Sequence, residues 1–350
     1  MDIRELDGNQ SRILINACQG YDVFREALKE ATKYNGGMHW KKVKGKEYLF
    51  RSIGRYGGGR SLGARSPETE RIYNSFHVNK KKVINRYKSS KAQVVEQARF
   101  NKAARIQRVP KLSAKILRLL DQKKLLGQHI MVVGTNAIYA YESAAGVQFD
   151  DALIATEDLD FLWDAKRSMK LAIKKDGYPE DFLSILKKID KTFQIKRDEP
   201  FRAANSENFL VDLIKAFPLK GIENKKHIGG PKDLIAAEIM NLEWLLSSPK
   251  FKQTAIGDDG LPVYIVAPDP RAFALHKFWT SQQLDRGRTK SARDGSQAIG
   301  VAKLVLQYLP MLEFDKAQLR MFPLDLVTDF KAKIQKELDS QLPNLEGPDL

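Results

Sequence analysis

The sequence predicts an α/β fold, in which a small mixed sheet is flanked by helices. Two observations predict the sheet and its flanking helices. Residues 129–145 have the pattern of a strand, a tight turn and a helix, and residues 157–163 and 209–214 are strand-like segments that carry acidic residues among apolar ones. We expect three parts: a basic extension built from a helix, a hairpin and a long helix over 1–127, a core with the mixed sheet over 128–267 and a helical C-terminal lobe over 268–350.

The extension is expected to begin with a helix over residues 10–34, which Gly36 and Gly37 end. A hairpin over 38–43 and 47–53 follows. Residues 54–61 are rich in glycine and superficially fit a phosphate-binding P-loop, but no helix begins where that motif needs one, so we interpret them as a flexible basic loop. Ser66 and Pro67 are typical of a helix start, and that helix is expected to run to about residue 107.

The excess positive charge of the chain lies in this extension. Residues 41–120 hold 22 Lys and Arg against 4 Asp and Glu, whereas residues 131–350 hold 30 against 32. Such a concentration favours a polyphosphate partner over a solvated face without one, although the second interpretation stays open. Single-stranded bases stack on aromatic rings such as Tyr73 and Tyr87, so RNA is the predicted partner. The candidate RNA-binding residues of the long helix are Lys80, Lys81, Lys82, Arg86 and Lys88.

The composition limits the class of protein further. The chain has 350 residues, of which 43% are hydrophobic, and this is enough to fold into more than one domain. The single Cys18 excludes a disulfide framework and a cysteine-rich zinc site. The first ten residues lack the apolar segment of a signal peptide, and no stretch approaches the roughly 18 apolar residues of a membrane span. We therefore expect a cytoplasmic protein without a membrane partner, and the oligomeric state stays unknown.

In the core, the strand at 129–133 is closed by Gly134 and Thr135, and a helix over 138–145 follows. Free N–H groups and the positive end of a helix hold a phosphate, glycine permits close approach, and the threonine hydroxyl adds a donor. Taken alone, this sequence is also a common turn. Further helices are expected over 179–191, 231–247, 270–284, 291–308 and 314–338.

Asp158 and Asp160 are two residues apart on a predicted strand, so their side chains point to one face and can converge on a divalent cation. Five acidic pairs with this spacing occur in the chain, about as many as chance gives. Only this pair lies between the apolar residues of an interior strand, where carboxylates without a cation are costly. Asp212, on the next strand, would be a third ligand in two-metal phosphoryl transfer, unless it is a strand-end cap.

These motifs resemble the polymerase-β-like nucleotidyltransferase superfamily, and more closely its bacterial GSU2403-type branch. The resemblance rests on the segments 132–137, 157–161, 211–213 and 268–277, and covers about 130–305. It implies a polymerase-β-like core with two Mg²⁺ ions, for which Mn²⁺ is an alternative. It also implies that Asp158, Asp160 and Asp212 are the catalytic residues and metal ligands, and that Gly134 and Thr135 hold the phosphates of an NTP.

Basic residues after the core complete the resemblance. Lys277, Lys290 and Arg293 are candidates for neutralising the triphosphate. The alternative for Arg293 is an ordinary surface ion pair with Asp294. The gap between Gly134 and Asp158 is longer than in compact members of the superfamily, so extra chain is expected to fold there, as in toxin-like branches.

The predicted activity is metal-dependent transfer of a nucleoside monophosphate from an NTP to a hydroxyl. RNA, with tRNA included, is the leading acceptor, and a protein hydroxyl or a small molecule stays open; a toxin or defence role is a further hypothesis. The competing hypothesis is a nucleic-acid-binding protein on an inactive transferase scaffold. The five histidines show no metal-ligand spacing, and the Gly-x-Ser-x-Gly elbow of serine hydrolases is missing.

Overall fold

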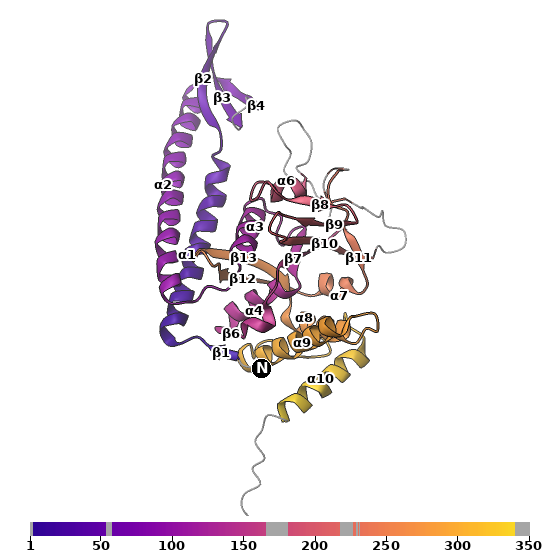
Figure 1. Cartoon of the computed structure of the whole chain (residues 1–350). Helices are drawn as coiled ribbons and strands as arrows, with labels where there is room; N and C mark the ends of the chain where they lie inside the picture. The colour runs from indigo at the N-terminus through magenta and orange to yellow at the C-terminus, as the bar shows by residue number, and fades with distance from the viewer. Residues whose placement is uncertain are drawn as a thin grey trace, which may run out of the picture. The chain divides into compact units, whose positions relative to one another are not determined.

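The computed structural model describes residues 3–53, 58–165, 181–217, 227–228, 230 and 232–339 (Figure 1). The chain divides into two compact units. We call Met1–Ser11, Arg108–Asp258 and Val263–Leu350 the core unit, and Arg12–Gln107 with Asp259–Pro262 the arm unit. The predicted mixture of helices around a small mixed sheet is confirmed. Within the described ranges, no helix has the length and apolar character needed to cross a membrane.

The arm unit holds most of a long helix, a three-stranded antiparallel sheet and a second long helix. These elements are α1 (Gly8–Lys33), β2 (Gly37–Val43), β3 (Lys46–Ile53), β4 (Gly58–Ala64) and α2 (Pro67–Ala103). Ser66 caps α2 as predicted, because its hydroxyl accepts the Thr69 N–H at 3.3 Å and its own N–H donates to the Thr69 hydroxyl at 2.8 Å. The helix ends before the predicted residue 107, and Arg105 takes the left-handed conformation there, with φ +57°.

The prediction of a flexible loop over the glycine-rich segment is wrong for residues 58–61. They belong to β4, which pairs antiparallel with β3 from Ile53–Gly58 onward. A Cβ on Gly59 would lie 2.6 Å from the Arg51 carbonyl oxygen, so the glycine lets the two backbones approach. Residues 54–57 of the same segment lie outside the described residues.

The core unit is built on a mixed sheet with the strand order β5-β7-β10-β9-β8, and β11 pairs with β10 beside this path. Strands β7 and β10 are parallel, whereas β5 and β9 are antiparallel to their neighbours. The bounds are β5 (Ile130–Val133), β7 (Asp158–Trp163), β8 (Gln194–Lys196), β9 (Glu199–Ala204), β10 (Leu210–Ala216) and β11 (Ala237–Ile239). Two strand pairs complete the unit: β1 (Ile3–Glu5) with β6 (Val147–Phe149), and β12 (Lys250–Ile256) with β13 (Pro262–Pro268).

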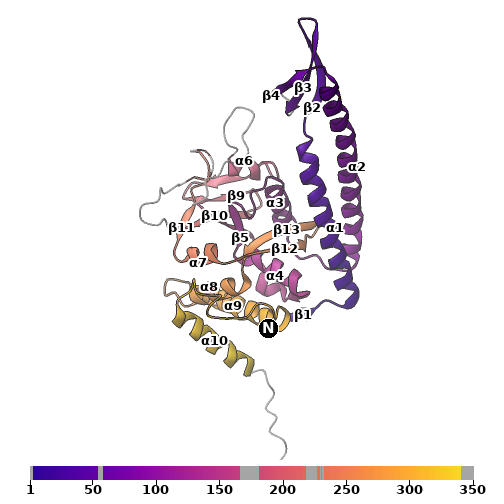
Figure 2. The ribbon, with the colours of Figure 1, turned by 180° about the vertical axis from the view of Figure 1, so that it is seen from behind.

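The helices of the core unit bury apolar side chains against this sheet and against each other. They are α3 (Lys111–Gln122), the 3₁₀ turn η1 (Thr135–Ala137), α4 (Ile138–Ala145), α5 (Asp151–Ile154), α6 (Phe182–Leu186), α7 (Leu242–Ser247), α8 (Pro270–Ser281), α9 (Arg288–Tyr308) and α10 (Leu324–Asp339). Helix α8 packs along α9, and α9 packs on α4 (Figures 1 and 2). Phe161 of β7 and Phe182 of α6 are fully buried, with their ring centroids 5.7 Å apart.

Several predicted helices differ from the structure. The helix expected over 231–247 is wrong, because residues 237–239 form β11, whose backbone pairs with β10. Among the described residues of that range only α7 is helical, and residue 231 lies outside them. The helix expected over 179–191 is limited to α6 within the described residues, and residues 179–180 lie outside them. The last helix begins after Pro323 rather than at 314. The extra chain expected before Asp158 folds as β6 and α5.

A buried ion pair ties α4 to the chain before α3. The Arg108 guanidinium donates to the Glu142 carboxylate at 2.8 Å and 3.0 Å and to Asp151 at 2.6 Å. The Glu142 side chain is 1% exposed and also accepts the Phe149 N–H at 2.6 Å. Burial raises the pKa of Glu142, although Arg108 opposes this shift. The arrangement fixes α4, and with it the turn that precedes it.

Candidate functional site

Three adjacent strands place charged side chains in one row. Asp160 of β7 is the register partner of Asp212 of β10, and Asp212 is the register partner of Arg202 of β9. Asp158 lies two residues before Asp160 and therefore projects to the same side of the sheet. All four side chains line one cavity of about 420 Å³. The parallel pairing of β7 with β10 is what brings residues 158, 160 and 212 together.

The structure brings together every catalytic and nucleotide-binding residue that the sequence predicted. Eight of the residues around the cavity are these: Gly134, Thr135, Asp158, Asp160, Asp212, Lys277, Lys290 and Arg293. The three predicted aspartates come from β7 and β10, whereas the predicted basic residues come from α8 and α9. Apolar side chains, among them Phe201, Phe273 and Trp279, complete the walls. The cavity thus combines a metal-type cluster, cations and an apolar surface.

Gly134 lies directly on the Asp160 carboxylate. Its φ of +62° and ψ of −159° are essentially restricted to glycine. A Cβ at this position would lie 2.1 Å from Asp160 Oδ2, so no other residue leaves room for that carboxylate. Asn136 of the same turn donates to the Asp158 carbonyl at 2.7 Å. The turn at Gly134 and the acidic strand β7 are therefore in direct contact through the Gly134 backbone and the Asn136 side chain.

Asp158 and Asp160 lie near a third carboxylate, and neither has an ion-pair partner among the described residues. Burial, followed by the negative charges of Asp158 and Asp212, raises the pKa of Asp160 to about 7, against the opposing effect of Lys277 and Arg202. Asp158 accepts a short hydrogen bond from the Thr156 hydroxyl. Hard carboxylate oxygens are the ligands that Mg²⁺ and Mn²⁺ prefer. The donor set of Asp158 and Asp160 therefore fits one divalent ion.

Asp212 is held differently from the other two aspartates. It is 6% exposed and lies inside β10, so it is not a strand-end cap. Both of its carboxylate oxygens accept hydrogen bonds from the Arg202 guanidinium, at 2.7 Å and 2.6 Å. Across the described ranges, no group of three or more His, Cys, Asp or Glu side chains is arranged to hold a metal ion. Asp212 thus lies beside the aspartate pair while its oxygens are taken up by an arginine.

Three basic residues of the cavity are held by hydrogen bonds: Lys277, Arg286 and Arg293. Lys277 donates to Asp294 at 2.6 Å, and Arg286 donates to the other oxygen of the same carboxylate at 2.8 Å. Arg293 donates to the Thr135 hydroxyl at 3.1 Å and to the Ala155 carbonyl. Asp294 is thus bound by Lys277 and Arg286, and the expected surface pair with Arg293 is not the arrangement that forms.

Three residues of the site were missed by the sequence reasoning: Arg202, Arg286 and Gln297. Gln297 donates to the Thr135 hydroxyl at 3.1 Å from α9. Arg286 precedes α9, close to the basic residues that were predicted, so the local charge was a usable signal. Arg202 and Gln297 carry no local signal, because their partners depend on strand register and helix packing.

The predicted RNA-binding residues lie on α2 in the arm unit. Lys81, Lys82, Arg86 and Lys88 are exposed there. Lys80 differs from them, since its ammonium donates to the Gly36 carbonyl and lies 5.7 Å from the ring centroid of Phe76.

The aromatic residues of α2 contact other rings of the arm unit. Tyr87 stacks on Phe24 of α1, with 5.8 Å between the ring centroids. Tyr73 lies 4.4 Å from the His77 ring and 5.7 Å from Trp40. These rings therefore stabilise the unit, and the exposed lysines and arginines remain its candidate RNA contacts.

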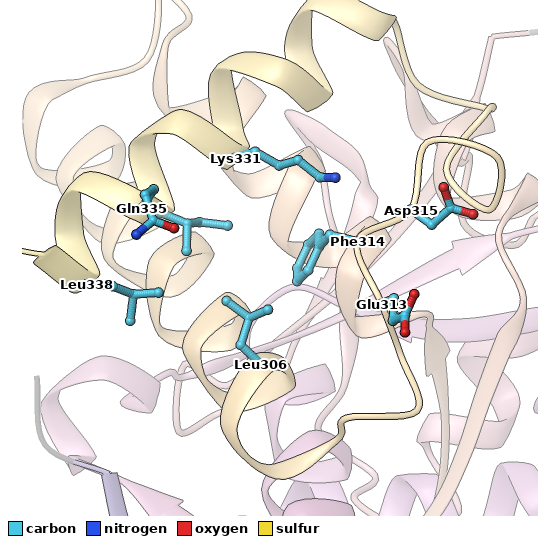
Figure 3. Close-up of a pocket in the computed structure, with 8 residues that line it drawn as sticks. Leu306, Glu313, Phe314, Asp315, Lys331, Gln335 and Leu338 are labelled. Atoms are coloured by element: carbon cyan, nitrogen blue, oxygen red, sulfur yellow. The ribbon is translucent and has the colours of Figure 1, made fainter.

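A second cavity, of about 500 Å³, lies between α9, the segment at 313–315 and α10 (Figure 3). Leu306, Phe314 and Leu338 form its apolar part, and Lys331 and Asp315 lie at its polar side (Figure 3). It has neither the glycine turn nor the convergent cations of the first cavity. We therefore place the candidate chemistry beside β7 and β10.

A family model described as nucleotidyltransferase matches residues 111–322, which is more than half of the chain, and the chain belongs to that family. The matched range contains the sheet, the aspartates and helices α8 and α9. The family supports transfer of a nucleoside monophosphate from an NTP, and nucleotidyltransferases generally use divalent metal ions. Neither the curated proteins nor the solved structures contain a match to this chain.

Proposed function

We propose that this protein transfers a nucleoside monophosphate from an NTP to a hydroxyl of an RNA acceptor, with release of pyrophosphate. One observation carries the proposal: Asp158, Asp160 and Asp212 line a single cavity with a glycine turn and five Lys and Arg side chains, inside the range of the family match. The arrangement supplies what phosphoryl transfer needs, which is positioning together with electrostatic stabilisation of the phosphates.

Asp158 and Asp160 would hold Mg²⁺, with Mn²⁺ as the alternative. When bound, such an ion neutralises charge on the phosphate oxygens. Gly134 lets the backbone of the turn approach the phosphates, and Thr135 adds a hydroxyl beside it. Lys277, Lys290 and Arg293 would contact the triphosphate from α8 and α9. Lys277 and Arg286 share Asp294, so they are oriented before the nucleotide arrives.

Asp212 would complete the triad beside the acceptor hydroxyl. In a two-metal arrangement it would be a ligand of the second ion. To do so, it has to exchange at least one of its hydrogen bonds with Arg202 for the ion. The parallel register of Asp212 with Asp160 supports this proposal.

The arm unit is the proposed acceptor-binding part, and residues 1–127, 128–267 and 268–350 remain our proposed functional division. The support is the positive charge of the extension and the exposed Lys81, Lys82, Arg86 and Lys88 on α2. RNA, with tRNA as one class to test, fits this charge better than a small acceptor. The same proposal includes membership of the GSU2403-type branch, a cytoplasmic location and a toxin or defence role. Growth arrest that follows expression of the native protein, but not of an Asp160 variant, would support the toxin or defence role.

Incubation of the protein with each α-³²P-labelled NTP, Mg²⁺ and total RNA tests the proposal. We expect label in RNA with at least one NTP, and loss of labelling by a factor of about 100 or more in Asp158→Asn and Asp160→Asn. Glu207→Gln is the matched control, because Glu207 is an exposed carboxylate in the turn before β10. RNA binding without transfer under any NTP, unaffected by the two aspartate variants, would instead support a binding protein on an inactive scaffold.

A further inference from the structure

The charges beside the cavity fall into balanced and unbalanced groups. Arg202 balances Asp212, and Asp294 is bound by Lys277 and Arg286. Asp158 and Asp160 have no ion-pair partner among the described residues. These two unpaired carboxylates are enough to hold one divalent cation. A second divalent ion would meet the positive guanidinium of Arg202 at the third carboxylate.

Arg202 is well fixed in this place. It is directly opposite Asp212 in the antiparallel pair of β9 and β10. Its Nε and Nη2 donate to the two oxygens of Asp212, and its Nη1 donates to Glu199 at 2.6 Å. Bidentate pairs of this type are among the strongest hydrogen-bonded ion pairs in proteins. Both oxygens that a second ion would need are therefore occupied by one side chain.

We propose that Arg202 is a positioning residue that limits the nucleotide-free site to one divalent ion, by withholding Asp212 from the metal. The inference rests on the proposed function, since it concerns the same aspartates. It assigns the first ion to Asp158 and Asp160 and makes entry of a second ion conditional on displacement of Arg202. The guanidinium of Arg202 and the second divalent ion then compete for the Asp212 carboxylate, and this competition sets the number of bound ions.

The test counts Mn²⁺ ions on the full-length protein without NTP, by titration calorimetry and electron paramagnetic resonance of free Mn²⁺. The native chain should bind one ion. Arg202→Gln should bind a second ion, and its first ion roughly tenfold or more tightly, because a positive charge next to the site is removed. The double variant Arg202→Gln with Asp212→Asn should return to one ion, since the freed ligand is lost again.

Arg197→Gln is the matched control, because it removes an exposed arginine from the turn between β8 and β9 and should leave the count at one. Circular dichroism and thermal unfolding check that the variants fold. If Arg202→Gln does not fold, Arg202→Lys replaces it. A lysine is a point charge without the bidentate geometry, so the second ion should again bind, although more weakly than with glutamine.

Two ions on the native chain, or a single ion of unchanged affinity in both Arg202 variants, would overturn the inference. Failure of this inference can be distinguished from failure of the proposed function. A native protein that transfers nucleotide but binds two Mn²⁺ ions refutes the role of Arg202 and keeps the function. A protein that binds one ion, gains the second in the Arg202 variant and transfers no nucleotide refutes the function and keeps the role of Arg202.

Discussion

Replacement of Gly134 by alanine tests whether the conformation of the turn determines the position of the Asp160 carboxylate. The backbone of Gly134 lies in a region that other residues avoid, and forcing alanine into it costs about 1–3 kcal/mol. The added Cβ would lie 2.1 Å from Asp160 Oδ2, so the carboxylate or the turn has to move. Overpacking of this kind adds about 1–3 kcal/mol. Gly134→Ala should therefore lower the free energy of unfolding by roughly 2–6 kcal/mol, the sum of these two ranges.

Gly146→Ala is the control for the backbone conformation alone. Gly146 also has a positive φ, of +67°, but a Cβ there meets nothing within 4 Å. Its replacement should cost about 1–2 kcal/mol and leave the site intact. Urea unfolding gives the two free energies, and Mn²⁺ titration gives the two affinities. Displacement of a catalytic group by about 1 Å reduces rates by about 100-fold, so transfer should be lost only in Gly134→Ala. The reasoning would be refuted if both variants had the same stability and both kept native Mn²⁺ affinity.

Three further predictions follow from the ion pairs and the charged surface. Burial, followed by the positive charge of Lys277, lowers the pKa of His276 to about 4, so the imidazole is protonated at a lower pH in the folded protein than in the unfolded chain. Between pH 7 and pH 5 the free energy of unfolding of the native protein should therefore fall by about 2 kcal/mol more than that of His276→Gln, as measured by urea unfolding. Glu142→Ala leaves Arg108 buried without its main partner and should lower the free energy of unfolding by about 3–5 kcal/mol. Lys81→Gln with Lys82→Gln should reduce the slope of log affinity for RNA against log salt by about 1–2, measured by filter binding.

The controls for these predictions use neighbouring groups. Stability that falls equally in native protein and His276→Gln between pH 7 and pH 5 would contradict the sign worked out for the buried imidazole. For the ion pair, Glu142→Gln keeps a hydrogen-bond acceptor and should cost less than Glu142→Ala. For the arm unit, Lys80→Gln should change the salt slope less than Lys81→Gln or Lys82→Gln, because the Lys80 ammonium donates to the Gly36 carbonyl. An unchanged slope in the Lys81 and Lys82 variant would remove α2 from the RNA-binding surface.

The parts of the fold that could be predicted are those that local patterns determine. The strand, the turn and the helix over 129–145 were predicted because an apolar run, a glycine and a helical pattern follow each other directly. Asp158 and Asp160 were predicted because residues two apart on a strand project to the same face, and this pair lies between apolar residues typical of an interior strand. In contrast, β11 was predicted as a helix, since its strand character comes from pairing with β10. Local propensity does not contain that pairing.

The candidate site shows the same division. Residues that act through their type and position in a motif, such as Gly134 and Asp212, were found from the sequence. Arg202 was not, because its partner is decided by the register of β9 on β10. The sequence therefore predicted three metal ligands, whereas the structure shows two open carboxylates and one that an arginine holds. Electrostatic roles of this kind depend on tertiary pairing and become visible only when the strands are in place.

The most direct test of the central claim compares two labels on one NTP. With native protein, Mg²⁺ and RNA, the α-phosphorus label should enter the RNA, whereas the γ-phosphorus label should leave as pyrophosphate, and both events should disappear in Asp160→Asn. Entry of the γ label into the RNA would mean phosphorylation instead of nucleotidyl transfer. Transfer of neither label with any of the four NTPs, or equal transfer by the Asp160 variant, would contradict the assignment of the chemistry to these aspartates.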